Sequence, residues 1–371
     1  MTKPIAVVLP MREQVTSGHA GAVALNVLEF GRVSAFRDRL IVVGGTKPDD
    51  FALPYHHVDV GRGVGLSMSW PFWHRASDRY ADAVADTILQ HGSRLVEVHN
   101  RGRLFLQLAR RLGSQTRMCL YLHNDPQTME ALETPIERVQ LLERASIVYC
   151  LSNYIRNRLI DGVESLSERV VVLPNGIAPL PADRSARDNT ILFVGRLIPE
   201  KGVEELFNAL QHVAALLPDW RVVIIGRVPR RHRSRYERSL AELRAIWGER
   251  LVLKESVPHA EVMQAYALAA ITVVPSRWQE PFGRTALEAL AQGSAVIASR
   301  SGGLPEIVGP AGFLLDAVTA DAIEHAILAL ARDPARREEL GKAGEDRARM
   351  HFDIALLSSR LDAWRDSLLA T

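Results

Sequence analysis

The stretch Ile271-Thr-Val-Val-Pro-Ser-Arg-Trp-Gln-Glu-Pro-Phe-Gly-Arg-Thr-Ala-Leu-Glu288 predicts three consecutive pieces of structure. Its first four residues form a short β-branched run, which predicts a buried strand. Residues 285–292 are mostly strong helix formers, and Gly293 after them is a residue that commonly follows a helix end. The stretch therefore predicts a strand, then a loop, then a helix.

Two glutamates in this stretch lie eight residues apart and predict a ligand site. Glu280 falls in the loop and Glu288 in the early turns of the helix, so their carboxylates can face one cavity and accept hydrogen bonds from hydroxyls. The N–H groups of residues 283–285 lie at the helix N-terminus, which attracts phosphate through its unpaired donors and its dipole. The alternative is a surface helix with two solvated glutamates, and the intervening Pro-Phe-Gly argues against it.

A second segment, Gly195-Arg-Leu-Ile-Pro-Glu-Lys-Gly202, has the same architecture. Residues 190–194 predict a strand, and the pattern from Val203 onward predicts an amphipathic helix. Arg196 can bind phosphate oxygens as a fork and Lys201 as a point charge. The chain has only five lysines against forty arginines, which favours a specific role for Lys201 over an exposed turn. Together the two segments indicate a site for a sugar attached to a diphosphate.

These segments resemble the C-terminal domain of the retaining glycosyltransferases of family 4, the bacterial polysaccharide and lipopolysaccharide type. The family's Glu-x7-Glu motif matches residues 280–288, its Gly-Arg-Leu-x-x-Glu-Lys-Gly segment residues 195–202, and its Gly-Gly-x-Pro-Glu turn residues 302–306. The resemblance spans essentially the whole chain and is weaker in the N-terminal half. It implies an α/β GT-B fold, in which two Rossmann-like parallel-sheet domains face an interdomain cleft and a C-terminal helix crosses back.

The resemblance also implies roles for individual residues. Glu288 would hold the ribose diol and Glu280 the hydroxyls of the donor sugar. Backbone N–H groups after Glu280 would contact sugar and phosphate, and the residues that follow the strand at 251–253 would flank the base. The implied donor-binding residues are Gly21, Arg196, Lys201, Val257, Pro258, Glu280, Phe282, Gly283, Arg284, Thr285 and Glu288.

The loop Ser17-Gly-His-Ala-Gly-Ala22 follows the first strand-like run. Its small residues let the backbone approach a ligand closely. The family usually has a double glycine here, and this chain departs from that order. We expect Gly21 to lie against the diphosphate and His19 on the acceptor side. An ordinary flexible loop is the alternative.

Two further histidines end strand-like runs in the N-terminal half. The resemblance implies a histidine beside the anomeric carbon after the fourth strand, a position that His123 occupies by strand order. His123 thus joins Arg196, Lys201 and Glu280 as the expected catalytic set. Its rival is His99, and a structural histidine is the alternative for each. The residues expected on the acceptor side or lining the cleft are His19, His99, Asn124, Asp125, Asn153 and Tyr154.

The alternation of strand-like and helical patterns predicts parallel sheets covered by helices. The polar, proline-rich stretch 174–189 predicts a boundary, giving an N-terminal acceptor domain (1–180), a nucleotide-sugar domain (181–352) and a returning helix (353–371). The expected strands are residues 5–9, 40–43, 95–98, 118–122, 147–150 and 170–173 in the first half, and 191–194, 221–225, 251–253, 271–274, 295–298 and 312–314 in the second.

Composition sets further bounds. A chain of 371 residues with 47% hydrophobic content suggests two domains, and a net charge of +2 gives no sign of nucleic acid. Cys119 and Cys150 do not have the Cys-x-x-Cys spacing of a metal site, and they favour a reduced, cytoplasmic compartment. The first ten residues turn polar too soon for a signal peptide, and no apolar run reaches 18 residues.

Two arginine-rich segments allow contact with anions or with the inner face of the membrane. For both residues 227–238 and residues 101–112 we favour ordinary helices, solvated in the first case and packed on the sheet in the second. The chain has no Asp-x-Asp pair, P-loop, Gly-x-Ser-x-Gly or Gly-x-Gly-x-x-Gly motif. We therefore expect no metal and no cofactor.

The sequence thus predicts a retaining, metal-independent hexosyltransferase. It would move a sugar from a nucleotide-diphosphate donor, with UDP favoured, to a glycan or lipid-linked acceptor in surface polysaccharide or glycolipid synthesis. A nucleotide-sugar epimerase of the same fold, a phosphorylase-like enzyme and a non-catalytic sugar-nucleotide-binding protein remain alternatives. A phosphorylase would need a cofactor lysine and a longer chain.

Overall fold

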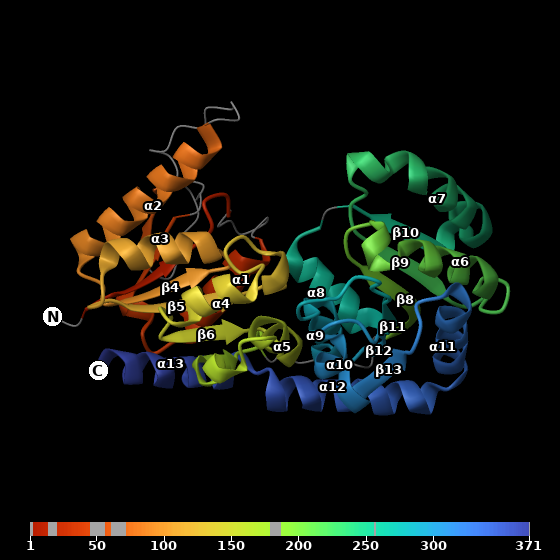
Figure 1. Ribbon diagram of the computed structural model, residues 1–371. Coiled ribbons are helices and arrows are strands. Elements are labelled where there is room, and N and C mark those ends of the chain that lie inside the picture. The colour runs from red at the N-terminus through yellow and green to blue at the C-terminus, as the bar shows by residue number, and fades with distance from the viewer. Residues whose placement is uncertain are drawn as a thin grey trace. The chain divides into compact units, whose positions relative to one another are not determined.

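The computed structural model describes residues 3–13, 21–44, 56–60, 72–178, 187–255 and 257–370 (Figure 1). The chain divides into two compact units. Unit 1 contains Met1–Gly176 and Ile354–Thr371, and unit 2 contains Ile177–Asp353. The division falls inside the proline-rich stretch 174–189.

Unit 1 is built on a parallel sheet whose described strands have the order β3-β2-β1-β4-β5-β6-β7. Every expected strand of the first half is present, with ends that differ by at most one residue. The edge strand β3 was not expected. The strands are β1 (Ile5–Val8), β2 (Leu40–Val43), β3 (His56–Val58), β4 (Leu95–His99), β5 (Arg117–Leu122), β6 (Ile147–Cys150) and β7 (Val170–Val172).

Helices cover both faces of this sheet, because successive side chains of its strands point to opposite sides. In β1, Ala6 and Val8 belong to one buried cluster, while Ile5 and Val7 belong to another that includes residues of α1 and α13. The helices of unit 1 are α1 (Ala22–Val33), α2 (Phe72–His91), α3 (Gly102–Leu112), α4 (Pro135–Leu142), α5 (Asn153–Ile160) and α13 (Ile354–Ala370).

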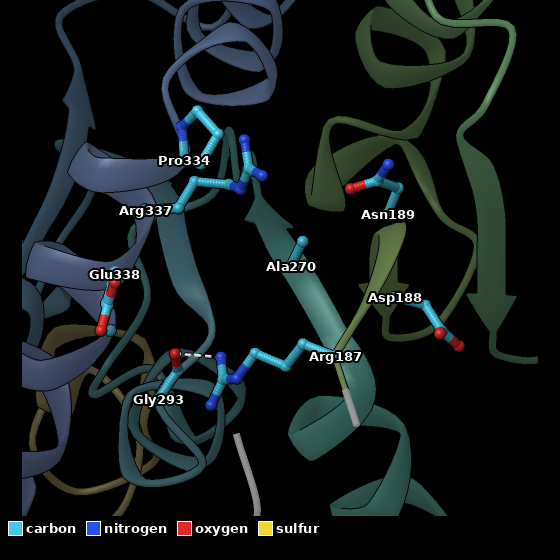
Figure 2. A pocket seen from close by; sticks show the side chains of 9 residues that line it. Arg187, Asp188, Asn189, Ala270, Gly293, Pro334, Arg337 and Glu338 are labelled. Carbon is cyan, nitrogen blue, oxygen red and sulfur yellow. Dashed lines mark hydrogen bonds between the residues drawn. The ribbon is translucent and has the colours of Figure 1, made fainter. Parts of the chain in front are cut away.

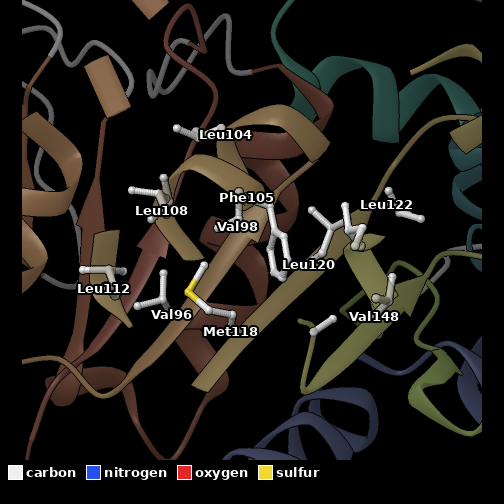
Figure 3. Packing of buried hydrophobic residues seen from close by; sticks show 14 of the residues in the cluster. Val96, Val98, Leu104, Phe105, Leu108, Leu112, Met118, Leu120, Leu122 and Val148 are labelled. Atoms are coloured by element: carbon white, nitrogen blue, oxygen red, sulfur yellow. The ribbon is translucent and has the colours of Figure 1, made fainter. Parts of the chain in front are cut away.

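Helix α3 packs on the sheet through its whole apolar face (Figure 3). Leu104, Phe105, Leu108 and Leu112 are buried against side chains of β4 and β5. This confirms the interpretation of residues 101–112 as a helix packed on its own sheet. These four side chains are therefore not available to a membrane surface.

The C-terminal helix α13 belongs to unit 1, in agreement with the expected return of the chain, and a buried ion pair anchors it there. Arg365 donates from Nε and Nη2 to the two carboxylate oxygens of Glu97 in β4, at 2.8 and 2.7 Å. It also donates to Asp362 at 3.0 Å and to Ser34 at 3.0 Å. The neighbouring carboxylates outweigh burial and raise the pKa of Arg365. The helix therefore carries a fixed positive charge into the core of unit 1.

Unit 2 is a second parallel sheet, with the order β10-β9-β8-β11-β12-β13 among the described strands. All of its strands were expected from the sequence, so the predicted GT-B fold class is confirmed at the level of each unit. The strands are β8 (Asp188–Val194), β9 (Arg221–Ile225), β10 (Leu251–Lys254), β11 (Ala269–Val274), β12 (Ala295–Ser299) and β13 (Gly312–Leu315).

Helices α6, α7 and α11 contribute to the large buried cluster on this sheet, and α12 packs against α9. Arg235 of α7 forms a bidentate pair with Glu204 of α6, so the arginine-rich segment 227–238 is an exposed, partly paired helix. The helices are α6 (Val203–Val213), α7 (Arg233–Trp247), α8 (His259–Leu268), α9 (Arg284–Ala291), α10 (Leu304–Val308), α11 (Ala320–Arg332) and α12 (Pro334–His351).

A pocket of about 300 Å³ lies at the N-terminal edge of the unit 2 sheet (Figure 2). Arg187 lines it and reaches the C-terminal end of α9, donating to the carbonyl oxygen of Gln292 at 2.5 Å and to that of Gly293. Positive charge at a helix C-terminus is stabilising. Arg187 therefore helps to orient the helix that carries Glu288.

Over the residues described, no helix is both long and apolar enough to span a bilayer.

Candidate active site

The two motif segments of unit 2 meet because their strands are neighbours. Strands β8 and β11 pair in parallel, with Ile191 opposite Ile271, so the loops that follow them leave the sheet at the same edge. The carbonyl oxygen of Glu200 accepts the N–H groups of Arg277 at 3.0 Å and Trp278 at 3.1 Å. The loop of the lysine motif is thereby tied to the loop of the glutamate motif.

Two glycines permit this close approach. Gly202 has φ +66°, and a Cβ added there would lie 1.9 Å from the carbonyl oxygen of Pro275. Gly302 has φ +57°, and a Cβ there would lie 2.2 Å from the carbonyl oxygen of Glu280. Only glycine combines a positive φ with the absence of a Cβ. Both motif glycines thus position the Glu280 loop.

Glu280 is buried between two donors. Its Oε1 accepts from Ser276 Oγ at 2.5 Å and from the Nζ of Lys201. Ser276 is itself fixed, because its carbonyl oxygen accepts the hydroxyls of Ser299 at 2.7 Å and Ser301 at 2.9 Å. The Oε2 of Glu280 accepts no hydrogen bond from a described residue. One carboxylate oxygen is therefore held by the protein and the other is left for a ligand.

Glu288, on helix α9, has a similar arrangement. It is 5% exposed, and its Oε1 contacts Arg284 Nε at 2.8 Å and His259 Nε2 at 2.9 Å. Burial acts to raise its pKa, but the His259 hydrogen bond and the Arg284 charge outweigh burial and leave the pKa lowered. Its Oε2 also has no partner among the described residues. Glu288 is therefore an anion with one open oxygen.

The sequence did not point to His259, although Val257 and Pro258 beside it were predicted to bind the donor. Pro258 is the N-cap of α8, and His259 is the first residue of that helix. Its contact crosses to α9, 29 residues later in the chain. The only signal in the sequence was a histidine at the start of a helix that follows a strand of unit 2.

Four residues that the sequence predicted to bind the donor lie between the two glutamates in the chain. Gly283 is the N-cap of α9 with φ +107°, and as a glycine it has no side chain that could cap the helix. Arg284 and Thr285 open the helix, so the expected helix N-terminus is present. The Phe282 side chain is buried, with its ring centroid 6.0 Å from that of Phe352. Only the backbone of Phe282 is therefore available to a ligand.

Arg196 follows β8 directly and is exposed. Its guanidinium makes no hydrogen bond or ion pair with any residue that the structure describes. It is therefore free to bind an anion from solution, on the same edge of the sheet as Lys201.

In unit 1 the two histidines from the sequence prediction lie side by side. His99 Nδ1 and His123 Nε2 are 3.0 Å apart, at the C-terminal ends of the neighbouring strands β4 and β5. Burial lowers the pKa of His123 to about 4. The pKa of His99 is lowered well below its ordinary value, first by burial and then by the charges of His123 and Arg365. Both rings are neutral at pH 7, so one donates to the other.

Asn100 fixes this pair. It has φ +56°, which is unusual for a residue with a side chain. Its Oδ1 accepts the backbone N–H of His123 at 3.1 Å. The His99 ring also stacks on Tyr121, with ring centroids 4.3 Å apart. Strained backbone of this kind often marks functional sites.

Two family models match the chain in succession. "Glycosyltransferase Family 4" matches residues 35–179, and "Glycosyl transferases group 1" matches residues 182–347. The chain belongs to this family of glycosyltransferases. Together the matched ranges contain both histidines of unit 1 and the whole glutamate site of unit 2.

Relatives of this glycosyltransferase are named for several reactions. A GDP-mannose-dependent alpha-(1-6)-phosphatidylinositol monomannoside mannosyltransferase from Mycolicibacterium smegmatis is 30% identical over 64% of this chain. A lipopolysaccharide 1,2-N-acetylglucosaminetransferase from Salmonella typhimurium is 23% identical, covering 70% of this chain and 69% of that protein. The chain spans only 54% and 66% of the length of two mannosyltransferases among its relatives.

The fold of the glycosyltransferase is also seen in solved structures. Sucrose-phosphate synthase from Thermosynechococcus elongatus superposes with a TM-score of 0.79 at 22% identity, covering 100% of both chains. At this identity the likeness shows the fold alone.

Asp125 has a structural role that the sequence prediction did not include. Its carboxylate accepts the N–H of Gln127 at 3.0 Å and pairs with Arg158 Nε at 3.0 Å. Asn124 beside it is exposed, and Asn153 and Tyr154 open α5 after the next strand. Asn124 and Asn153 are both exposed, whereas Tyr154 is half-buried.

Gly21 is the N-cap of α1, as a residue against a phosphate would be. The nearest anion is the chain's own Glu13, whose Oε1 accepts the N–H of Ala24 at 3.1 Å. His19 lies outside the described residues. Within the described ranges, no three His, Cys, Asp or Glu side chains gather in a way that could hold a metal ion.

Proposed function

We propose that this glycosyltransferase moves a sugar, with retention of anomeric configuration, from a nucleotide-diphosphate donor to an acceptor hydroxyl. The observation that carries the proposal is the pair of buried glutamates at one edge of the unit 2 sheet. Each has one oxygen bound to a cationic side chain, and its other oxygen has no partner among the described residues. A sugar nucleotide presents hydroxyls at two places, on the sugar and on the ribose, and carries charge between them.

Lys201 and Arg196 supply the charge for the diphosphate in this proposal. The ammonium of Lys201 has three N–H donors, of which Glu280 takes one. Arg196 offers a complete guanidinium. Donors of fixed position stabilise charge that develops on a leaving group. The leaving diphosphate would be stabilised by these two residues and the α9 N-terminus, without a divalent ion.

Glu280 is assigned to the hydroxyls of the donor sugar and Glu288 to the ribose diol, with Val257 and Pro258 beside the base. The resemblance favours uracil as the base of the donor. The relative from Mycolicibacterium smegmatis is GDP-mannose-dependent by name. Guanine and uracil donors are therefore the two to compare first.

His123 is assigned to the reacting carbon. A buried neutral ring at the end of β5 can stabilise an oxocarbenium-like centre with its side chain or with the adjacent carbonyl oxygen. Attack from the face that the phosphate leaves, with the phosphate as base, would retain configuration. Asn124 is the neighbouring candidate for the acceptor hydroxyl.

The acceptor proposed is a glycan or a lipid-linked sugar, as in surface polysaccharide or glycolipid synthesis. The support is the naming of two relatives, one for a phosphatidylinositol mannoside and one for lipopolysaccharide. Contact with the inner membrane surface belongs to this proposal.

The test is turnover of sugar nucleotides by wild type and the Glu280→Gln variant, with EDTA present and absent, and with NMR of the product anomer. We expect an α-linked product from an α-donor, no effect of EDTA, and a large loss in the variant. Glu338→Gln, an exposed glutamate of α12, is the matched control. Undiminished turnover in the Glu280 variant would remove this site, and donor isomerisation without an acceptor would indicate an epimerase.

A further inference from the structure

A second polar cavity lies in unit 1, at the edge of the sheet opposite the histidines. It has a volume of about 870 Å³ and opens between the end of α3, the first residues of β5 and the loop before β6. Small-molecule sites have volumes of roughly 300–1,000 Å³. Four arginines and one glutamate line it: Arg110, Arg117, Arg144, Arg169 and Glu143. We call this cavity with its four arginines the basic basin.

Three of these arginines form no ion pair within the described part of the chain. The guanidinium groups of Arg110, Arg117 and Arg144 form no hydrogen bond or ion pair with any described residue. Other arginines of α3 differ in this respect, since Arg103 pairs with Glu130 and Arg111 with Asp82. Unpaired positive charge in the basin is thus not a general feature of this helix.

The wall of the basin is fixed by the fourth arginine. Arg169 Nη1 donates to the carbonyl oxygens of Leu142, Glu143 and Ala145, at 3.1, 3.0 and 3.2 Å. These carbonyls belong to the segment that carries Arg144. Arg117 begins β5, and its N–H donates to the Arg94 carbonyl oxygen at 2.7 Å. The backbones that bear the unpaired guanidinium groups are therefore held in place.

We propose that the basic basin binds a phosphate-bearing anion. Guanidinium groups match phosphate oxygens as planar forks, and several around one cavity favour a group with more than one negative charge. Hydroxyls of Ser114 and Ser146 also line the cavity and can donate to phosphate. A terminal phosphate of a soluble molecule and a phospholipid headgroup share this chemistry.

The basin is separate from the reaction site proposed above. Strand β5 runs from Arg117 at the basin to Leu122, and His123 follows. At about 3.3 Å per residue, the backbone of Arg117 lies roughly 20 Å from that of His123. An anion in the basin would therefore bind at the same time as a substrate at the other edge of the sheet.

The experiment is a calorimetric titration with inorganic pyrophosphate in a Lys201→Gln background, which weakens binding at the proposed donor site. We expect one remaining class of site in this background. Its affinity should fall at least tenfold when Arg110→Gln and Arg144→Gln are added. Arg37→Gln with Arg111→Gln is the charge-matched control and should leave the affinity unchanged. All four side chains are exposed, and circular dichroism checks the fold.

A second arm uses sedimentation with vesicles of phosphatidylglycerol and phosphatidylcholine, or of phosphatidylcholine alone. The proposal is supported, with a lipid headgroup as the phosphate, if the protein binds the anionic vesicles but not the neutral ones and the Arg110 and Arg144 changes weaken that binding. Arginine-dependent binding of pyrophosphate would support it with a soluble ligand. The proposal is overturned if neither probe binds, or if the Arg110 and Arg144 changes leave binding as it was.

Discussion

Replacing Gly302 by alanine tests how closely the Glu280 loop must be placed. The new Cβ would lie 2.2 Å from the carbonyl oxygen and 2.6 Å from the amide nitrogen of Glu280. Ordinary contacts begin at 3.4 Å, so the loop must shift by about 1 Å. A misplacement of this size near a reacting centre costs about 100-fold in rate. We expect kcat/KM to fall by about that factor.

Gly248 provides the matched control within unit 2. It has φ +56°, against +57° for Gly302, and an added Cβ would meet nothing within 4 Å. Because φ is positive at both positions, each alanine variant should lose roughly 1–3 kcal/mol of stability from backbone strain. Thermal unfolding measures this loss in each variant, and donor turnover measures how far the variants differ in activity. Equal turnover in the two variants would refute the argument that Gly302 positions Glu280.

Three further outcomes are expected. Lys201→Gln should lower kcat by about 100- to 1,000-fold in a donor-turnover assay that contains EDTA, and restoration of the rate by a divalent metal would contradict the role given to the lysine. Arg365→Ala should destabilise the fold by about 3–5 kcal/mol, because it leaves buried Glu97 without its counter-charge; denaturant unfolding tests this, and a loss under 1 kcal/mol would count against it. His123 has a pKa of about 4 when folded and 6.5 ordinarily, so the unfolded chain binds more protons in that window. Its contribution should lower the free energy of unfolding by on the order of 3 kcal/mol as the pH falls from 6.5 to 4, so His123→Asn should flatten the profile of unfolding free energy against pH relative to wild type, and an unchanged profile would contradict the burial of this ring.

The sheets were predictable because parallel strands buried on both faces are continuous apolar runs. Ile147–Cys150 and Arg221–Ile225 are examples in which the expected and observed bounds agree. The edge strand His56–Val58 was missed, since its residues are exposed or only half-buried and no apolar run marks it. Strand β8 begins at Asp188, earlier than its apolar run, because the strand extends past the core.

The glutamate motif could be placed on a loop and a helix from sequence, but not all of its partners could be. The contacts of Glu288 to Arg284 and His259 differ in this respect: the first is one helical turn away, and the second depends on how α8 packs near α9. The pairing of His99 with His123 likewise depends on the register of β4 with β5. Tertiary placement decides such contacts.

Thermal shift with a panel of sugar nucleotides tests the central claim most directly. UDP-, GDP-, ADP- and TDP-sugars would be added without metal to wild type and to Glu288→Gln. A ligand that binds the native state raises its melting temperature. We expect one nucleotide class to raise the melting temperature of wild type and to lose most of that effect in the variant. No shift with any nucleotide, or the same shift in both proteins, would contradict the assignment of Glu288 and its open oxygen to the donor.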